Sequence, residues 1–173
     1  INVDMMLFAA LGSVIALVFA GVLFFRTKKQ PAGNELMVKI SAAIKRGADA
    51  YLKRQYLGVG IFFAVVFLVL LTLAVLGYLN PFVPFAFLTG GFFSGLSGFI
   101  GMRTATMANG RTAYAASKGL NRGLRVAFSA GAVMGFVVVG LGLLDLSIWY
   151  FFLKFYYTVI SPVASQEVMI EHI

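Results

Sequence analysis

The sequence predicts an all-α, polytopic membrane protein in which four helices cross the bilayer. Two observations lead to this fold class: 61% of the 173 residues are hydrophobic while only 12% are charged, and the apolar residues gather in four long runs. A soluble domain has about 45–50% apolar and about 25% charged residues, and a chain this short cannot bury so much apolar surface in one core. A soluble enzyme and a disordered chain are therefore both excluded. The absence of cysteine also excludes disulfides and thiolate metal sites.

The predicted spans cover residues of about 5–25, 57–78, 82–102 and 126–152. Each is long enough to cross about 30 Å of hydrocarbon, which takes roughly 20 apolar residues. The first three spans carry no charge, and the fourth contains only Asp145. The first span is not a signal peptide, because Asp4 stands where a basic flank is needed and the apolar run is too long.

The basic residues predict the orientation of these spans. Of the fourteen Lys and Arg residues, all except Lys154 lie in two segments, 26–56 and 103–125, which fall on the same side of a four-span chain. The positive-inside rule makes that side cytoplasmic, so both termini are expected outside. Aromatic residues gather at the predicted outer interface, where an aromatic belt is expected: Tyr78, Phe82, Trp149, Tyr150, Tyr156 and Tyr157.

Residues 34–80 are predicted to form one continuous helix that extends the second span far into the cytoplasm. Asn34 follows a Pro-Ala-Gly turn and is a suitable N-cap, and no strong breaker follows before Asn80. The helix would measure roughly 65 Å at about 1.5 Å per residue. Its apolar stripe from Leu36 to Leu52 must pack against a partner, and Asp49 is placed to pair with lysines one turn away.

The second cytoplasmic segment, residues 103–125, is expected to be a loop rich in small residues. Four of its cations have the spacing of a single helical face: Arg111, Lys118, Arg122 and Arg125. One interpretation is a basic lining that attracts an anionic substrate such as a phosphate compound. In the other, which we favour, these cations only mark the cytoplasmic side of the membrane and contact anionic lipid headgroups. Residues 118–123 resemble a phosphate-binding loop only superficially, because no strand precedes them.

Small residues are predicted to mediate helix packing inside the membrane. The third span carries Gly91, Ser94, Gly95, Gly98 and Gly101, and the fourth carries Gly131, Gly135 and Gly142. Such patterns let helix backbones approach closely in lipid. Self-packing of four helices is the simplest explanation, but two glycine faces favour a larger assembly. The chain starts at Ile1 without an initiator Met and ends at Ile173 after an apolar stretch, 155–164, so we expect a fragment.

No catalytic, cofactor-binding or metal-binding residue is predicted in this sequence. The six acids do not cluster with the spacing of metal ligands or of an acid–base pair, and neither a P-loop nor a nucleophile elbow is present. Asp145 is the one acid in a span and is either a proton relay or, as we favour, a side chain near the outer interface. The single histidine, His172, lies in a polar tail and is expected to be inert.

Three stretches resemble the membrane-integral, ion-translocating inorganic pyrophosphatases. They are GADAYLKRQY (47–56), GFIGMRTATMANGRTAYAA (98–116) and GLNRGLRVAFSAGAVMGFVVVGLGLLDLS (119–147). Together with the order of the spans they cover most of residues 35–147. Asp145 departs from the family pattern, which has a small apolar residue or glycine there, and leaves the local helix end open.

The resemblance implies a much longer chain of about sixteen helices in two concentric rings, which works as a homodimer in the cell membrane. Members hydrolyse magnesium pyrophosphate and export H⁺ or Na⁺, with Mg²⁺ as cofactor and K⁺ as a further candidate. Their Asp-rich motifs lie on later helices and are absent from this sequence. Residues 1–173 would then be a single transmembrane domain, an N-terminal outer-ring scaffold that is inactive alone.

The alternative hypothesis is a small, non-catalytic four-span membrane protein, such as a packing subunit or a channel component. Binding of nucleic acid is a poor third explanation for the sequence pI of about 10.0. The basic residues lie beside spans and lack the aromatic stacking platform that single strands require.

Overall fold

The computed structural model describes residues 3–160, which form four long α-helices and a short π-helix. They are α1 (Val3–Lys28), α2 (Glu35–Val75), α3 (Val83–Ser117), α4 (Leu120–Phe155) and the π-helix η1 (Tyr156–Ile160). Each of the four α-helices contains a segment long and apolar enough to cross a membrane. The all-helical class and the four spans are thus confirmed. His172, Glu167 and Glu171 lie outside the described residues.

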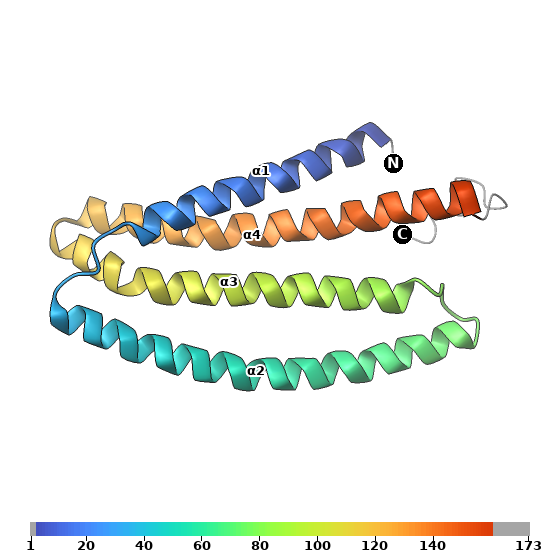
Figure 1. The fold of residues 1–173 in the computed structure, drawn as a ribbon, viewed down its shortest axis with the longest axis horizontal. Helices are drawn as coiled ribbons and strands as arrows, with labels where there is room; N and C mark the ends of the chain where they lie inside the picture. Colours follow the sequence, from blue (N-terminus) through green and yellow to red (C-terminus); the bar gives the residue numbers. More distant parts are fainter. Residues whose placement is uncertain (1–2, 161–173) are drawn as a thin grey trace.

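The four helices lie side by side in a single layer, in the order α1, α4, α3, α2 (Figure 1). α4 packs between α1 and α3, and α2 packs against α3. The beginning of α1 and the end of α4 lie at one end of the layer, and the α1–α2 and α3–α4 connections lie at the other (Figure 1). We call the latter the basic end, because it carries segments 26–56 and 103–125. The chain therefore runs the length of the layer four times, in alternating directions, as the sequence predicts.

The core lies along α4, the helix that is covered on two sides. Its buried residues are Ala20 of α1 and Val133, Val137 and Leu141 of α4, with side chains of α1 and α3 packed around them. Most other large apolar side chains face outward; Phe128 is 74% exposed. A single layer of helices has two open faces, and apolar side chains on both are favourable only in lipid or against further protein.

Hydroxyl groups buried in the layer bond to the helices that carry them. Ser13 donates to the carbonyl of Ala10 at 2.7 Å, and Thr27 donates to the carbonyl of Leu23 at 2.9 Å. Both side chains are almost completely buried, at 0% and 2% exposure. Their polar groups are therefore satisfied without a partner helix, as a helix in hydrocarbon requires.

α2 is a single helix of 41 residues, about 62 Å long at about 1.5 Å per residue. Asn34 caps it as predicted, since its Oδ1 accepts a hydrogen bond from the Met37 N–H at 2.9 Å. Gly33 precedes the cap with φ +98°, a left-handed conformation that favours glycine. The helix curves smoothly through Gly58 and Gly60 without a break (Figure 1).

The apolar stripe in the N-terminal half of α2 is only partly covered within the described residues: Leu36 is 64% exposed and Ile40 is 51% exposed, whereas Leu52 is buried. That it packs against a partner stays a prediction. The expectation about Asp49 is wrong. Asp49 does not pair along its own helix. Its Oδ1 lies 3.3 Å from Nη2 of Arg103, the one ion pair among the side chains that the structure describes, and so joins α2 to α3.

Residues 103–125 are not a loop, in contrast to our expectation. α3 continues to Ser117 and α4 begins at Leu120, so only Lys118 and Gly119 connect them. The alanine-rich sequence favours helix, and Gly119, with φ +139°, allows the sharp reversal. The four cations singled out above therefore lie on two antiparallel helices and their connection instead of on one helical face.

The small residues of α3 pack as predicted, chiefly against α2. A Cβ on Gly91 would clash with the ring of Phe63, and one on Gly95 would lie 3.5 Å from the ring of Tyr56. The Tyr56 hydroxyl donates a hydrogen bond to the Gly95 carbonyl, which a side chain at this glycine would crowd. Gly101, further along, faces Met134 of α4.

The glycines predicted to pack on α4 do not do so within the described residues. Gly131, Gly135 and Gly142 have no atom within 4 Å of the position where a Cβ would stand. Instead, Gly140 lies against α1 and Gly123 lies against the backbone of Ala116. We call the surface around Gly131, Gly135 and Gly142 the open glycine face.

Replacing Tyr56 with phenylalanine is expected to lower the stability of the α2–α3 pair. The change removes one interhelical hydrogen bond, and such bonds contribute about 0.6 kcal/mol on average in membrane proteins. Thermal unfolding in detergent should show a fall of about 1–3 °C. Tyr51→Phe is the matched control, because Tyr51 is 57% exposed on the same helix. An equal effect of both substitutions would contradict the assignment.

Candidate functional site

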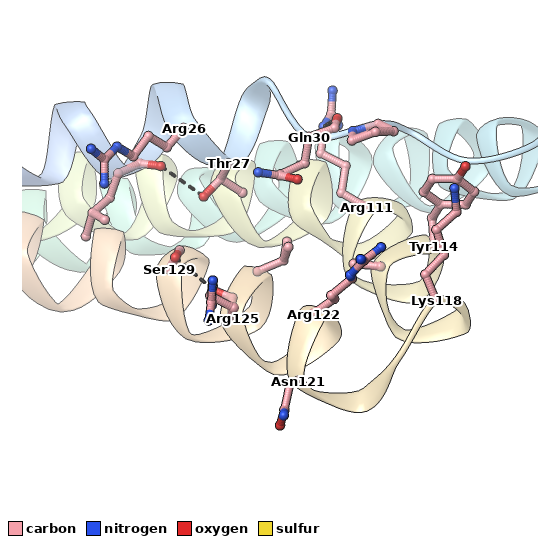
Figure 2. A pocket seen from close by; sticks show the side chains of 14 residues that line it. Arg26, Thr27, Gln30, Arg111, Tyr114, Lys118, Asn121, Arg122, Arg125 and Ser129 are labelled. Carbon is pink, nitrogen blue, oxygen red and sulfur yellow. Dashed lines mark hydrogen bonds between the residues drawn. The ribbon is translucent and has the colours of Figure 1, made fainter.

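A basic cavity of about 680 Å³ opens at the basic end, between the end of α1 and the α3–α4 connection (Figure 2). Fourteen side chains line it, and none of them is acidic. Five carry a positive charge: Arg26, Arg111, Lys118, Arg122 and Arg125. Because no acidic side chain in the lining balances these five charges, the cavity has a positive potential and attracts anions.

Two of the five cations have contacts within the protein, and a third lies at a favourable helix end. Arg111 donates from Nε to the carbonyl of Gln30 at 3.1 Å, and from Nη1 to the carbonyl of Met107 at 2.9 Å. It thereby joins α3 to the end of α1. Lys118 Nζ lies 4.6 Å from the centre of the Tyr114 ring. Arg26 lies in the last turn of α1, where a cation interacts favourably with the helix dipole.

Arg122 and Arg125 are not accounted for in this way. Arg122 lies in the first turn of α4, the positive end of its dipole, where a cation is unfavourable, and Arg125 lies in the next turn. No acidic residue lies in the first turn of α4, and Gly119 offers no side-chain cap. Both side chains are exposed, and neither guanidinium has a hydrogen-bond or ion-pair partner among residues 3–160. Figure 2 shows Arg122 directed toward the space between the helix ends, whereas Asn121 points away.

The structure brings together all four cations that the sequence singled out in segment 103–125. It also adds residues that sequence reasoning missed, above all Arg26, with Thr27 and Ser129 nearby in the lining. Arg26 directly follows the first span, and Arg125 directly precedes the fourth. If α1 and α4 had been known to be neighbours, the span ends would have placed these two residues beside each other at the same membrane surface.

A second cavity, of about 550 Å³, lies beside the first at the basic end. Its charged lining residues are again all basic: Lys28, Lys45, Arg103 and Arg111. Arg111 separates the two cavities, because it lines both. The positive potential therefore extends across the ends of α1, α2 and α3.

Asp145 lies at the opposite half of the layer, between α4 and α3. Its Oδ1 is buried and has no hydrogen-bond partner within the described chain. A Cβ on Gly90 of α3 would lie 3.4 Å from its Oδ2, so the missing side chain of that glycine leaves room for the carboxylate. One turn further on, Trp149 donates from Nε1 to the Thr89 hydroxyl at 2.7 Å. Asp145 therefore points into the α3–α4 contact.

The aromatic residues predicted at the outer interface gather at this end of the helices. The ring of Phe82 packs against those of Trp149 and Tyr156, at centroid distances of 6.5 and 4.9 Å. Asn80 donates from Nδ2 to the Tyr157 hydroxyl at 2.9 Å and thereby ties the α2–α3 connection to η1.

The residues described here do not fit a magnesium centre. Magnesium is bound by carboxylates together with phosphate oxygens and waters, and no group of three His, Asp or Glu side chains lies together within residues 3–160. Glu35 and Asp49 are on α2 while Asp145 is on α4, at different ends of the layer.

A layer of four membrane-spanning helices, with cations gathered at one end, defines a segment of a polytopic integral membrane protein. Residues 14–171 match the family model described as inorganic H⁺ pyrophosphatase. The chain belongs to this family, as the three sequence stretches indicated.

Curated relatives agree with this assignment. The chain is 54% identical over 145 residues to a protein of Bacteroides thetaiotaomicron provisionally named a K⁺-stimulated pyrophosphate-energized sodium pump, with 82% of this chain and 20% of the relative covered. It is 40% identical over 142 residues to a K⁺-insensitive pyrophosphate-energized proton pump of Methanosarcina mazei, with 82% and 21% covered. The chain thus spans about one fifth of the length of these relatives.

Proposed function

We propose that residues 1–173 form the N-terminal scaffold of a membrane-bound pyrophosphatase that couples hydrolysis of magnesium pyrophosphate to export of H⁺ or Na⁺. The observation that carries the proposal is the match of residues 14–171 to the inorganic H⁺ pyrophosphatase family. Relatives named as sodium pumps and as proton pumps both align with the same part of the chain. The alternative of a small four-span packing or channel subunit has no comparable support.

The single layer of helices supports a scaffold role. Gly131, Gly135 and Gly142 leave a strip of α4 backbone uncovered, and small residues in a span favour close helix contacts. We propose that the open glycine face packs against further helices of the longer chain. The exposed apolar stripe of α2 at the basic end, around Leu36 and Ile40, would be covered in the same way.

The catalytic chemistry is proposed to lie outside this segment. The described acids do not assemble a magnesium site, so Mg²⁺ and pyrophosphate would bind to carboxylates elsewhere in the protein. We also propose a homodimer in the cell membrane, with the basic end in the cytoplasm and both termini outside. This orientation rests on the basic residues of segments 26–56 and 103–125.

Activity measurements on membranes test the proposal. Membranes that contain the full-length protein should hydrolyse pyrophosphate only in the presence of Mg²⁺ and should accumulate H⁺ or Na⁺. Membranes that contain residues 1–173 alone should do neither. Hydrolysis by the segment alone would contradict the scaffold role, and the absence of hydrolysis by the full-length protein would contradict the pump.

A further inference from the structure

We propose that the basic cavity binds a phosphate group at the membrane surface, held mainly by Arg122 and Arg125. This inference does not depend on pyrophosphatase activity, because it concerns binding at the ends of α1, α3 and α4. Neither the family match nor the names of the relatives assign a ligand to this place.

The argument starts from the charge balance of the cavity. Contacts within the protein explain the positions of Arg111 and Lys118, and the dipole of α1 favours Arg26 in its last turn. Arg122 and Arg125 add two charges at the positive end of α4, with no carboxylate in the lining. Such an arrangement is electrostatically unfavourable when the cavity holds only water. A bound anion makes the electrostatic energy of the cavity favourable, since both guanidinium groups and the dipole of α4 then attract the anion.

The chemistry of the lining favours phosphate over other anions. A guanidinium group matches the oxygen atoms of a phosphate in a forked, two-bond geometry. Thr27 and Ser129, which also line the cavity, direct their hydroxyl hydrogens to carbonyls of their own helices. Neither hydroxyl oxygen accepts a hydrogen bond from an arginine among the described residues. The guanidinium donors of Arg122 and Arg125 therefore remain available to a ligand.

The depth of the cavity indicates the source of the phosphate. Its wall includes Leu23 and Val126, which belong to the apolar parts of α1 and α4, while Lys118 lies beyond the helices. A lining that passes from apolar to basic within one cavity corresponds to the headgroup layer of a bilayer. The phosphodiester of an anionic phospholipid therefore fits best, and a soluble phosphate compound is the second source with the same chemistry.

Lipid titration of the purified full-length protein in detergent tests the proposal. Native mass spectrometry would count the molecules of phosphatidylglycerol retained at each concentration, with phosphatidylcholine as the neutral lipid. R122Q/R125Q should weaken binding of phosphatidylglycerol by at least about tenfold, or about 1.4 kcal/mol, because both charge-assisted hydrogen-bond donors to the phosphate are lost. R46Q/R54Q is the matched control: it removes the same charge from exposed positions of α2 that line neither cavity, and it should change binding less than twofold.

Competition distinguishes the two sources of phosphate. If millimolar inorganic phosphate or pyrophosphate leaves phosphatidylglycerol bound, the ligand is the lipid; if either displaces it, the site takes soluble phosphate. R122K/R125K, which keeps the charge but removes the fork, should bind with intermediate affinity. The single variants R122Q and R125Q, checked by thermal unfolding, guard against a folding defect in the double variant. Equal loss in both glutamine pairs, or no retention of phosphatidylglycerol by the folded wild-type protein, would overturn the proposal.

Discussion

Replacing Gly140 with leucine is expected to lower the unfolding temperature of the 173-residue chain by about 2–10 °C. A Cβ at this position would lie 2.8 Å from Cγ of Leu17 and 3.2 Å from the backbone oxygen of Ser13, both on α1. The backbone atom cannot rotate away, so α1 and α4 must separate. Overpacking of this kind costs about 1–3 kcal/mol, and thermal unfolding in detergent measures it.

Gly135→Leu is the matched control for this substitution. It makes the same chemical change on the same helix, but no atom lies within 4 Å of the added Cβ. The gain in helix propensity from glycine to leucine applies to both variants, so the difference between them isolates the contact with α1. If the two variants unfold at the same temperature, α1 does not pack on α4 in the way described.

Gly135 also connects this experiment to the proposed scaffold. In the full-length protein, leucine at position 135 should lower the unfolding temperature if the open glycine face packs against further helices. The same substitution should be harmless in residues 1–173 alone. An unchanged stability in both proteins would mean that this face meets lipid instead of protein.

Replacing Asp145 with leucine is expected to raise the stability of the 173-residue chain. The Oδ1 atom is buried without a partner among residues 3–160, and an unsatisfied buried polar group costs about 1–3 kcal/mol. Its removal should raise the unfolding temperature by about 2–10 °C. Leucine has nearly the same branched shape as aspartate, whose carboxylate already lies beside Gly90, a residue without a side chain.

Asp145→Asn separates the effect of the charge from the effect of the unpaired polar oxygen. Asparagine removes the charge, whose cost in a membrane span depends on depth, but it keeps a polar oxygen in the same place. We therefore expect a smaller rise than with leucine. A lower unfolding temperature for both variants would show that the carboxylate has a stabilising partner, which would give new support to a role in transport.

The elements of the fold follow largely from the sequence, because lipid imposes strict rules on a chain. Long apolar runs must form helices there, and the four runs do so. The start of α2 is also predictable from local sequence, because Asn34 is a typical N-cap and Gly33 tolerates the left-handed backbone before it. The gathering of small residues on α3 also predicts close helix packing, and the structure shows that the partner is α2, at Gly91 and Gly95.

How the helices pack against one another is much harder to predict from the sequence. Polarity at residues 103–125 suggested a loop, although α3 and α4 simply continue as helices beyond the apolar core. The neighbours of a helix in lipid depend on shape, since lipid tails are as apolar as leucine. The sequence therefore does not show that α1 lies beside α4, and that contact brings Arg26 into the basic cavity. For the same reason, Gly140 was missed while Gly135 was chosen.

The order of the helices in the layer has a consequence for biosynthesis. α2, α3 and α4 each lie beside the helix that precedes or follows them in the chain, whereas α1 packs chiefly on α4. If the helices enter the membrane in chain order, α1 must wait in lipid until the other three have been inserted. The internal hydrogen bonds of Ser13 and Thr27 suit it to that interval, since they leave neither hydroxyl exposed to hydrocarbon without a partner. Of these four helices, α1 is thus the one that is made before its main neighbour, α4, and its buried hydroxyls need no neighbour in the meantime.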